Sequence, residues 1–435
     1  MKKVLIITYY WPPAGGPGVQ RVLKFAKYLP EYGWMPIILT VNKGEYPSID
    51  ETLLDEIPDT IRVYKTYSLE PGFLYKKFTG MSDEEKIPTA VLAEKEPSFK
   101  KKIARWLRLN LFIPDAKIGW KPYAVSEGKK IIDKEKPDLI YSSSPPPTVH
   151  LIARKLKQYS SLRWIADFRD PWTDIHYYEN LHKNSLSNKM DCRLEKAVLH
   201  ECDKIVCVSQ YDIDMDFGKK VSESKCINIA NGYDEKDFDD IRQGVTDQRI
   251  FNFMHLGVVG IERCPNNLFK IIHELGEKKI ISETDFQLTF VGKVETEVKH
   301  IIDKFKINKF VKYIPYLPHN EALKYSSQAS ALLLLITQSK KNIRILPGKT
   351  FEYMRIGIPI MALGPENGEV ARIFNTLDYY KVIDYKNARE ISKFLIQIYN
   401  IHKEGRNKAL KPTREIEKYE RKNLTKQLAA IFDNI

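Results

Sequence analysis

Short apolar runs alternate with amphipathic runs along most of the chain, and this alternation limits the possible folds more than any other feature. The run VLIITYY at 4–10 precedes a Gly- and Pro-rich loop, a segment at 19–29 with apolar residues at helical spacing, and a second apolar run at 36–41. Continuous apolar runs of this length are typical of parallel strands that helices cover on both faces. Further runs of this kind lie at 61–67, 137–143, 163–168, 204–209 and 226–232.

A polar segment at 233–249 interrupts the pattern, and a second alternating series follows it. We interpret this segment as a linker, because 435 residues exceed the usual size of one compact domain. The prediction is an α/β protein with two Rossmann-like, doubly wound domains, 1–240 and 250–408, facing a cleft that serves as the ligand site. The apolar runs of the second series lie at 251–259, 286–292, 311–316, 331–336, 358–364 and 380–385.

The chain is basic, with 69 Lys and Arg against 56 Asp and Glu and a net charge of +13. Such a charge attracts nucleic acid, anionic lipid or a phosphorylated substrate. The sequence lacks zinc-finger spacing, an RNP aromatic motif and a basic zipper. We therefore expect no nucleic-acid partner.

The cysteines and the N-terminal run are typical of a cytoplasmic protein. The five cysteines include no Cys-x-x-Cys pair, and no His cluster has metal-ligand spacing. The run at 4–10 is short and lacks a small-residue cleavage site, so we interpret it as a buried strand and not as a signal peptide. No apolar stretch approaches the roughly 18 to 20 residues that cross a bilayer. The prediction is a cytoplasmic protein without a bound metal.

Two loops combine glycine with a predicted helix start. In PPAGGPG at 12–18, Gly15 and Gly16 allow close approach of the backbone to an anion, but a plain tight turn fits as well, and the dinucleotide fingerprint Gly-x-Gly-x-x-Gly is absent.

In PGKTFE at 347–352, Pro347 and Gly348 form a turn, and Lys349 and Thr350 begin a helix. A phosphate fits against the free N–H groups and Lys349, while Glu352 accepts hydrogen bonds from sugar hydroxyls. The alternative is a solvated lysine and a glutamate that only complements the helix dipole.

Six segments carry a resemblance that covers nearly the whole chain. They are YYWPPAGGPGVQR (9–21), DFRDPWT (167–173), LEKAVLHECDKIVCVS (194–209), NGYDEKDF (231–238), YLPHNEAL (316–323) and PGKTFEYMRIGIP (347–359). In their order and spacing they resemble the retaining GT-B glycosyltransferases of family four, which include many bacterial polysaccharide and lipopolysaccharide enzymes. The resemblance implies an N-terminal domain on the acceptor side, a C-terminal domain that binds the donor, and a last helix, 412–435, that returns to the N-terminal domain.

In that family two glutamates eight positions apart bind the donor, and the second binds its ribose. Glu352 matches the second position, whereas Arg344 stands where the first glutamate contacts the transferred sugar.

The family also has a glycine followed by an arginine and a lysine that bind the donor diphosphate. Gly257 matches the glycine, Val258 occupies the arginine position, and Arg263 falls on the lysine position. We hypothesise that Lys349 replaces the missing cation, because neutralising a diphosphate requires no particular strand.

In the predicted N-terminal domain, DFRDPWT places Asp167, Arg169 and Asp170 after a buried strand. They orient acceptor hydroxyls or the donor sugar, or they form an ion pair that stabilises the loop beside Trp172. Arg21 senses an acidic acceptor or is an ordinary surface arginine. The catalytic candidates are Asp167, Arg169, Arg263 and Lys349; the donor-binding candidates are Gly15, Gly16, Arg263, Gly348, Lys349, Thr350 and Glu352; the acceptor candidates are Arg21 and Asp170.

The resemblance implies transfer of a hexose, with retention, from a nucleotide diphosphate sugar of the UDP or GDP type to a glycan or lipid-linked acceptor in bacterial cell-envelope polysaccharide synthesis. It implies no cofactor and no metal, since cations and helix starts neutralise the leaving group. Two alternatives stay open: a nucleotide-sugar epimerase of the same fold, and a catalytically weak binding subunit, which Arg344 and Val258 suggest.

The segment FKKKIARWLRLNLFIP at 99–114 is basic and amphipathic, with Ile103, Trp106, Leu107 and Leu111 on one helical face. Residues 99–113 therefore suit an anionic membrane surface, which would make the protein peripheral on the inner face of the cytoplasmic membrane. An apolar face buried within the domain is the alternative.

Overall fold

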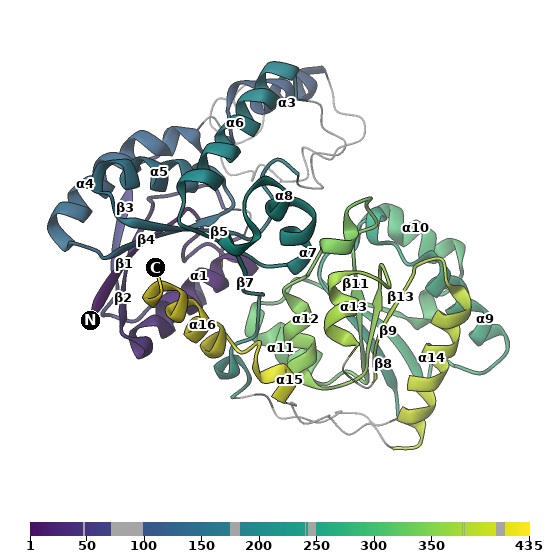
Figure 1. Cartoon of the computed structure of the whole chain (residues 1–435). Helices are drawn as coiled ribbons and strands as arrows, with labels where there is room; N and C mark the ends of the chain where they lie inside the picture. Colours follow the sequence, from purple (N-terminus) through teal and green to yellow (C-terminus); the bar gives the residue numbers. More distant parts are fainter. Residues whose placement is uncertain are drawn as a thin grey trace. The chain divides into compact units, whose positions relative to one another are not determined.

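A computed structural model describes residues 1–46, 48–70, 99–174, 183–239, 241, 249–375, 377, 379–405 and 414–435. The chain divides into two compact units, the first formed by Met1–Ala230 with Arg421–Ile435 and the second by Asn231–Glu420. Each unit contains one sheet with helices packed on it (Figure 1). The predicted domain end at 408 and helix start at 412 lie outside the described residues.

The sheet of the first unit has seven parallel strands in the order β3, β2, β1, β4, β5, β6, β7. The strands are β1 (Lys2–Thr8), β2 (Trp34–Val41), β3 (Arg62–Thr66), β4 (Leu139–Ser144), β5 (Arg163–Phe168), β6 (Lys204–Cys207) and β7 (Cys226–Asn228). The α-helices are α1 (Pro17–Tyr28), α3 (Phe99–Leu111), α4 (Lys121–Glu135), α5 (Thr148–Ser160), α6 (Ser185–Glu201), α7 (Gln210–Asp212), α8 (Gly218–Lys220) and α16 (Arg421–Asp433).

Both faces of this sheet are buried, which explains why its strands are continuously apolar in the sequence. On β1, Leu5 and Ile7 join a core with residues of α4 and α5, whereas Val4 and Ile6 join a core with residues of α1 and α16. Successive side chains of a strand point to opposite faces, so each face needs its own apolar set. The predicted doubly wound arrangement is confirmed.

The last helix, α16, packs on the first unit beside α1 (Figure 1). The carboxylate of Asp433 accepts hydrogen bonds from Lys2 Nζ at 3.0 Å and from Trp34 Nε1 at 3.2 Å. The rings of Trp34 and Phe432 meet edge to face with centroids 5.2 Å apart. These contacts tie the C-terminal end of the chain to its first two strands.

The sheet of the second unit has six parallel strands in the order β10, β9, β8, β11, β12, β13. The strands are β8 (Phe251–Leu256), β9 (Phe286–Val291), β10 (Val311–Ile314), β11 (Ala331–Leu335), β12 (Ile360–Leu363) and β13 (Tyr380–Ile383). The α-helices are α9 (Asn266–Glu277), α10 (Thr296–Lys304), α11 (His319–Ser326), α12 (Lys349–Ile356), α13 (Glu369–Phe374), α14 (Ala388–Lys403) and α15 (Arg414–Glu417).

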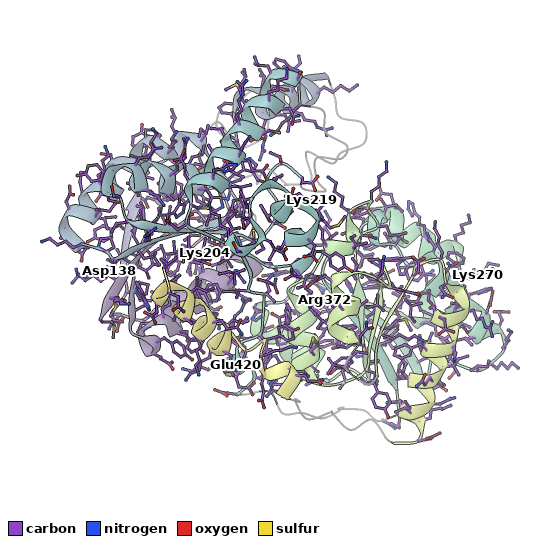
Figure 2. All side chains as sticks on the ribbon, in the orientation of Figure 1. Asp138, Lys204, Lys219, Lys270, Arg372 and Glu420 are labelled. Carbon is purple, nitrogen blue, oxygen red and sulfur yellow. The ribbon has the colours of Figure 1, made fainter. Side chains whose placement is uncertain are left out.

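The chain passes from the first unit to the second between Ala230 and Asn231, ahead of the predicted linker. Residues that follow this point are held by the second unit: Tyr233 N donates to Tyr419 O at 3.2 Å, and Glu235 pairs with Arg355. An isolated parallel β-bridge also pairs Tyr233 with Glu420, the residue labelled in Figure 2. The described start of this segment is therefore packed on the second unit.

In both sheets the strand order reverses beside the first strand of the unit, between β1 and β4 and between β8 and β11. Open α/β sheets bind ligands at the carboxyl ends of the strands that flank such a point. The loops after these four strands are therefore the expected sites.

Among the helices that the structure describes, none combines the length and the apolar character needed to cross a membrane.

Candidate functional site

The end of β8 holds the most specific arrangement in the second unit. Gly257, the residue after the strand, has a left-handed backbone with φ of +133°. A Cβ at this position would lie 2.2 Å from Lys349 Nζ. Because glycine leaves this space empty, Lys349 crosses the strand end and donates a hydrogen bond to Leu256 O at 2.5 Å.

Lys349 is the first residue of α12, and Gly348 precedes it without a side-chain cap. Burial lowers the pKa of the Lys349 ammonium to about 8; Glu352 opposes this shift, and the charge of Arg263 adds to it. The lysine is therefore a cation whose charge is only partly compensated by its surroundings. A bound anion would stabilise its charged form.

Two buried polar atoms near Lys349 have no hydrogen-bond partner among the described residues: Thr350 Oγ1 and His255 Nε2. Thr350 is the second residue of α12. His255 Nδ1 lies 2.9 Å from Leu333 O, which requires the proton on Nδ1 and leaves Nε2 as an acceptor. Burial, helped by Lys349, lowers the pKa of His255 to about 3, so the ring is neutral. A buried polar atom without a partner needs an explanation, and a bound polar ligand beside Lys349 would supply one for both atoms.

Arg263 brings a second cation to the same strand ends. It closes a short 3-10 helix, Ile261–Arg263, and its Nε donates to Thr337 Oγ1 at 2.9 Å. Thr337 follows β11, so this hydrogen bond ties the loop after β8 to the loop after β11.

Glu352 lies in the first turn of α12 and its Oε1 is 2.9 Å from His319 Nε2. His319 is the first residue of α11. Sequence reasoning assigned His319 no role, although it lies in the YLPHNEAL segment; only the packing of α11 beside α12 reveals the contact. His319 positions the carboxylate that the sequence assigned to the ribose.

Arg344 ends the 3-10 helix Asn342–Arg344 and is partly buried.

In the first unit, Gly15 and Gly16 fold their loop against residues 48–50. Gly15 N donates to Ser48 O at 2.9 Å, and Asp50 N donates to Pro13 O at 2.8 Å. Gly16, with φ of +103°, precedes α1 as its N-cap. These contacts support the tight-turn interpretation of the loop, and donor contact there stays a prediction.

Arg21 and Asp167 bind each other in the interior of the first unit, and both are 0% exposed. Arg21 Nη2 and Nε donate to the two carboxylate oxygens at 2.9 and 3.2 Å, and Arg21 also donates to the carbonyls of Ile229 and Ala230. Ser143 Oγ donates to the same carboxylate at 2.6 Å. These contacts tie α1 to the ends of β4, β5 and β7, and the catalytic role of Asp167 and the acceptor role of Arg21 stay predictions.

Arg169 lies over the first turn of α1. Its Nε donates to Ser144 O at 2.6 Å and its Nη2 to Pro145 O at 3.2 Å. A Cβ on Gly18 would stand 1.6 Å from Arg169 Nη1, so the glycine makes room for the guanidinium. Burial lowers the pKa of Arg169, and the charge of Asp170 opposes this shift. Arg169 thus joins the loops after β4 and β5 to α1.

The structure therefore collects the candidates in two sets, each within its own unit. Around the ends of β8 and β11 and the start of α12 lie Arg263, Gly348, Lys349, Thr350 and Glu352. Around the ends of β1, β4 and β5 lie Gly15, Gly16, Arg21, Asp167, Arg169 and Asp170.

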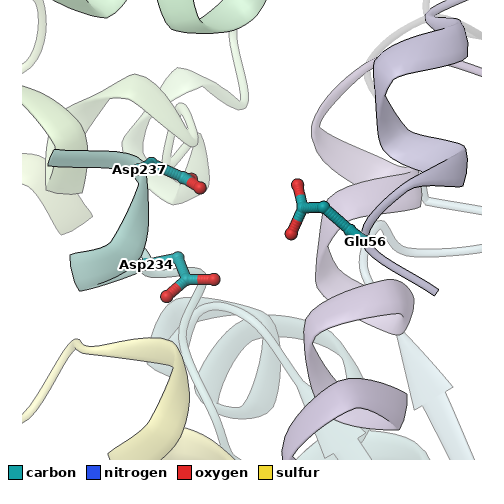
Figure 3. A group of neighbouring side chains, drawn as sticks. All are labelled: Glu56, Asp234 and Asp237. Carbon is teal, nitrogen blue, oxygen red and sulfur yellow. The ribbon is translucent and has the colours of Figure 1, made fainter. Parts of the chain in front are cut away.

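We assign no metal to the carboxylates of Glu56, Asp234 and Asp237, which Figure 3 shows together with their parent segments. Glu56 belongs to the first unit, where Lys24 and Lys27 bind it at 2.7 and 2.9 Å. Burial alone would raise the pKa of Glu56, but these lysines lower it. Asp234 of the second unit caps a 3-10 helix by accepting from Lys236 N at 3.3 Å.

The chain is similar to known glycosyltransferases in part of its sequence and in its whole fold. Residues 87–237 match the model of glycosyltransferase family 4. Sucrose-phosphate synthase from Thermosynechococcus elongatus aligns over 100% of this chain and 99% of its own, with 13% identity and a TM-score of 0.66. HepE from Anabaena, in complex with UDP, aligns over 100% of both chains with 12% identity and a TM-score of 0.62. TarM aligns over 100% and 99%, with 11% identity and a TM-score of 0.65.

No curated protein matches the sequence. At these identities the solved structures establish the fold, which is GT-B, and the predicted fold class is confirmed.

Proposed function

We propose that this protein is a retaining glycosyltransferase that moves a hexose from a nucleotide diphosphate sugar, of the UDP or GDP type, to a glycan or lipid-linked acceptor in cell-envelope polysaccharide synthesis. The observation that carries the proposal is the position of Lys349. Its side chain extends from the start of α12 over Gly257 at the end of β8, and two unsatisfied buried polar atoms lie nearby. The similarity to family 4 over 87–237 and the UDP held by HepE support the choice of substrate.

The charges at the end of β8 suit a diphosphate. Lys349 and Arg263 provide two cations, and the start of α12 provides the positive end of the helix dipole together with Thr350 Oγ1. Val258, which stands where related enzymes have an arginine, is 49% exposed and contributes no charge. Lys349 supplies the missing cation from α12.

Glu352 gives the site its second recognition element. A carboxylate accepts hydrogen bonds from the vicinal hydroxyls of a ribose, and charge-assisted hydrogen bonds of this kind are among the stronger ones. His319 holds one oxygen of this carboxylate, which limits the rotation of the side chain before the nucleotide binds.

The main chemical task in such a transfer is to stabilise the negative charge that grows on the leaving diphosphate. Lys349 and Arg263 are held in place by hydrogen bonds to Leu256 O and Thr337 Oγ1, so little reorganisation accompanies the reaction. In this mechanism the two side chains take the place of a metal ion. The catalytic contributions of Arg169 and of the first-unit loops belong to the same proposal.

Arg344 favours one alternative, a catalytically weak binding subunit, because it replaces the glutamate that contacts the transferred sugar. A nucleotide-sugar epimerase of the same fold is the other alternative. The epimerase would convert the donor without any acceptor, and the binding subunit would release no nucleotide with any acceptor extract.

The test is a thermal-shift panel with UDP, GDP, ADP, CMP and dTDP on the wild type, Lys349→Met and Lys270→Met. Lys270 is an exposed lysine of the same unit, paired only loosely with Glu274 at 3.8 Å, and serves as the matched control (Figure 2). We expect UDP or GDP to raise the Tm of the wild type and of Lys270→Met but not of Lys349→Met. No shift with any nucleotide, or an equal shift in Lys349→Met, would contradict the proposed donor site.

Activity is then measured as release of nucleoside diphosphate from the matching sugar donor, with and without a membrane-lipid extract as acceptor, in the presence of EDTA. Release that depends on the extract supports transfer. Conversion of the donor to its epimer without the extract and without net release of nucleoside diphosphate supports the epimerase.

A further inference from the structure

Large apolar side chains are exposed together where α3 meets α6 in the first unit. Trp106 and Leu111 on α3 are 51% and 64% exposed, and Leu186 and Met190 on α6 are 69% and 45% exposed. Single exposed apolar residues are normal on a soluble protein, whereas several on contacting helices form a surface for binding. We call these four residues the α3/α6 patch.

The two helices are joined firmly at the patch. Asn110 is buried, and its Oδ1 accepts a hydrogen bond from Asn184 N at 2.7 Å while its backbone carbonyl accepts from Ser187 Oγ at 3.0 Å. Leu111 and Leu186 are the sequence neighbours of these bonded residues, so both exposed leucines lie at the junction of the two helices. Figure 1 shows α3 and α6 side by side.

Two acidic residues of α6, Asp191 and Glu195, point inward. Asp191 accepts from Trp172 Nε1 at 2.7 Å and pairs with Lys183. Glu195 accepts from Thr173 Oγ1 at 2.7 Å and pairs with Lys220 at 2.8 Å. Both carboxylates are buried and their charges are compensated inside the unit.

The basic residues of the same helix point outward. Lys189 and Arg193 are exposed, and with Leu186 and Met190 they occupy positions i, i+3, i+4 and i+7 of one helical face. Helix α3 adds the described basic residues Lys102, Arg105 and Arg108, and its sequence contains no acidic residue. The two helices therefore carry basic residues together with the exposed apolar ones.

We propose that the α3/α6 patch docks on an anionic lipid bilayer, with the four apolar side chains at the acyl boundary and the basic residues on the headgroups. Apolar area combined with Lys and Arg is what binds proteins to such interfaces. A second copy of this chain fits less well, because a twofold contact through the patch brings the basic residues of both copies together. The sequence suggested only the α3 half of this surface; the α6 half comes from the structure.

The experiment is co-sedimentation of the full chain, without nucleotide, with vesicles of pure phosphatidylcholine and with vesicles of equal parts phosphatidylcholine and phosphatidylglycerol. We expect binding to the anionic vesicles alone, weakened by salt. The pair Leu186→Ser with Met190→Ser, and the pair Lys189→Glu with Arg193→Glu, should each lower the vesicle affinity at least about tenfold, since each basic residue near the surface contributes on the order of fivefold.

The controls are Met215→Ser, which changes a methionine of the same unit with the same 45% exposure, and Lys155→Glu, which changes an exposed lysine on α5. All these side chains are exposed, so the variants are expected to keep the wild-type Tm. Equal binding to neutral vesicles, no binding, or unchanged binding by the α6 variants would overturn the proposal. A change from dimer to monomer in those variants would do so as well, in favour of a contact between two copies.

Discussion

The ammonium nitrogen of Lys349 lies 2.2 Å from the point where a Cβ at position 257 would stand, and it donates to the carbonyl of Leu256, 93 residues earlier in the chain. A strand end and a helix start are thereby joined through one side chain. The strand end holds the cation in place, and the helix start adds the positive end of its dipole beside it. Each part of this arrangement can be tested separately.

The first prediction concerns the space above Gly257. In Gly257→Ala the new methyl group displaces Lys349 Nζ, so we expect the affinity for the nucleoside diphosphate that stabilises the wild type best to fall at least about tenfold, or about 1.4 kcal/mol. The left-handed backbone also makes alanine unfavourable by roughly 1–2 kcal/mol of folding free energy. Isothermal titration calorimetry measures the affinity, and urea unfolding measures the stability.

The control variant Gly33→Ala separates the effect of displacing Lys349 from the effect of backbone strain. Gly33 has φ of +83°, and a Cβ there would meet nothing within 4 Å. This variant should lose a similar amount of stability and keep the wild-type nucleotide affinity. An equal loss of affinity in both variants would mean that backbone strain, and not the position of Lys349, weakens binding.

The second prediction is a pH dependence. Because burial lowers the pKa of Lys349 to about 8, the ammonium is charged below that pH and loses its proton above it. Affinity for the nucleoside diphosphate should be constant between about pH 6.5 and 7.5 and should then fall by up to about tenfold per pH unit. Lys349→Arg keeps its charge throughout this range and should show a much flatter profile.

The stability of the unliganded protein changes with pH in the opposite direction. The pKa of Lys349 is lower in the folded chain, about 8, than its ordinary value of 10.5, so the unfolded chain binds more protons between these values. This group therefore makes the folded state more stable as pH rises through that window. The difference between wild type and Lys349→Met in urea unfolding at several pH values measures its contribution, and a difference that does not change with pH would falsify this assignment.

The third prediction concerns the contact between His319 and Glu352. If His319 positions the carboxylate for a ribose, then His319→Ala and Glu352→Gln should each weaken nucleoside diphosphate binding by about three- to tenfold, and the double variant should lose little more than either one. Binding of inorganic pyrophosphate, which has no ribose, should stay unchanged. Additive losses in the double variant would show that the two side chains act separately.

The sequence predicted the fold well because the alternation of apolar strands and amphipathic helices is repeated many times along the chain. Strands buried on both faces, such as β1, must be apolar at every position, and the helices between them carry their apolar residues at helical spacing. Glycine and proline then mark the loops. None of this requires knowledge of which residues meet across the fold.

The sites were predicted less completely, because their geometry depends on contacts between distant parts of the chain. The residue types of Lys349 and Glu352 suggested a phosphate and a sugar, but the position of Lys349 above Gly257 depends on how α12 packs against β8. His319 looks like an ordinary polar residue at a helix start until α11 is placed beside α12. Arg21 and Asp167, which are 146 residues apart, look like two independent charged side chains.

The last prediction concerns this buried ion pair. Arg21 and Asp167 are 0% exposed, and removal of one partner leaves the other charged and buried, which costs roughly 3–5 kcal/mol. Arg21→Met and Asp167→Leu should each destabilise the protein by about that amount in urea unfolding, whereas the double variant should recover part of the loss because no uncompensated charge remains. Nucleotide affinity should stay at the wild-type value in any of these variants that folds, since both side chains belong to the first unit. A single variant with normal stability but a changed KM for the acceptor would instead restore the acceptor-binding or catalytic role that the sequence suggested for these residues.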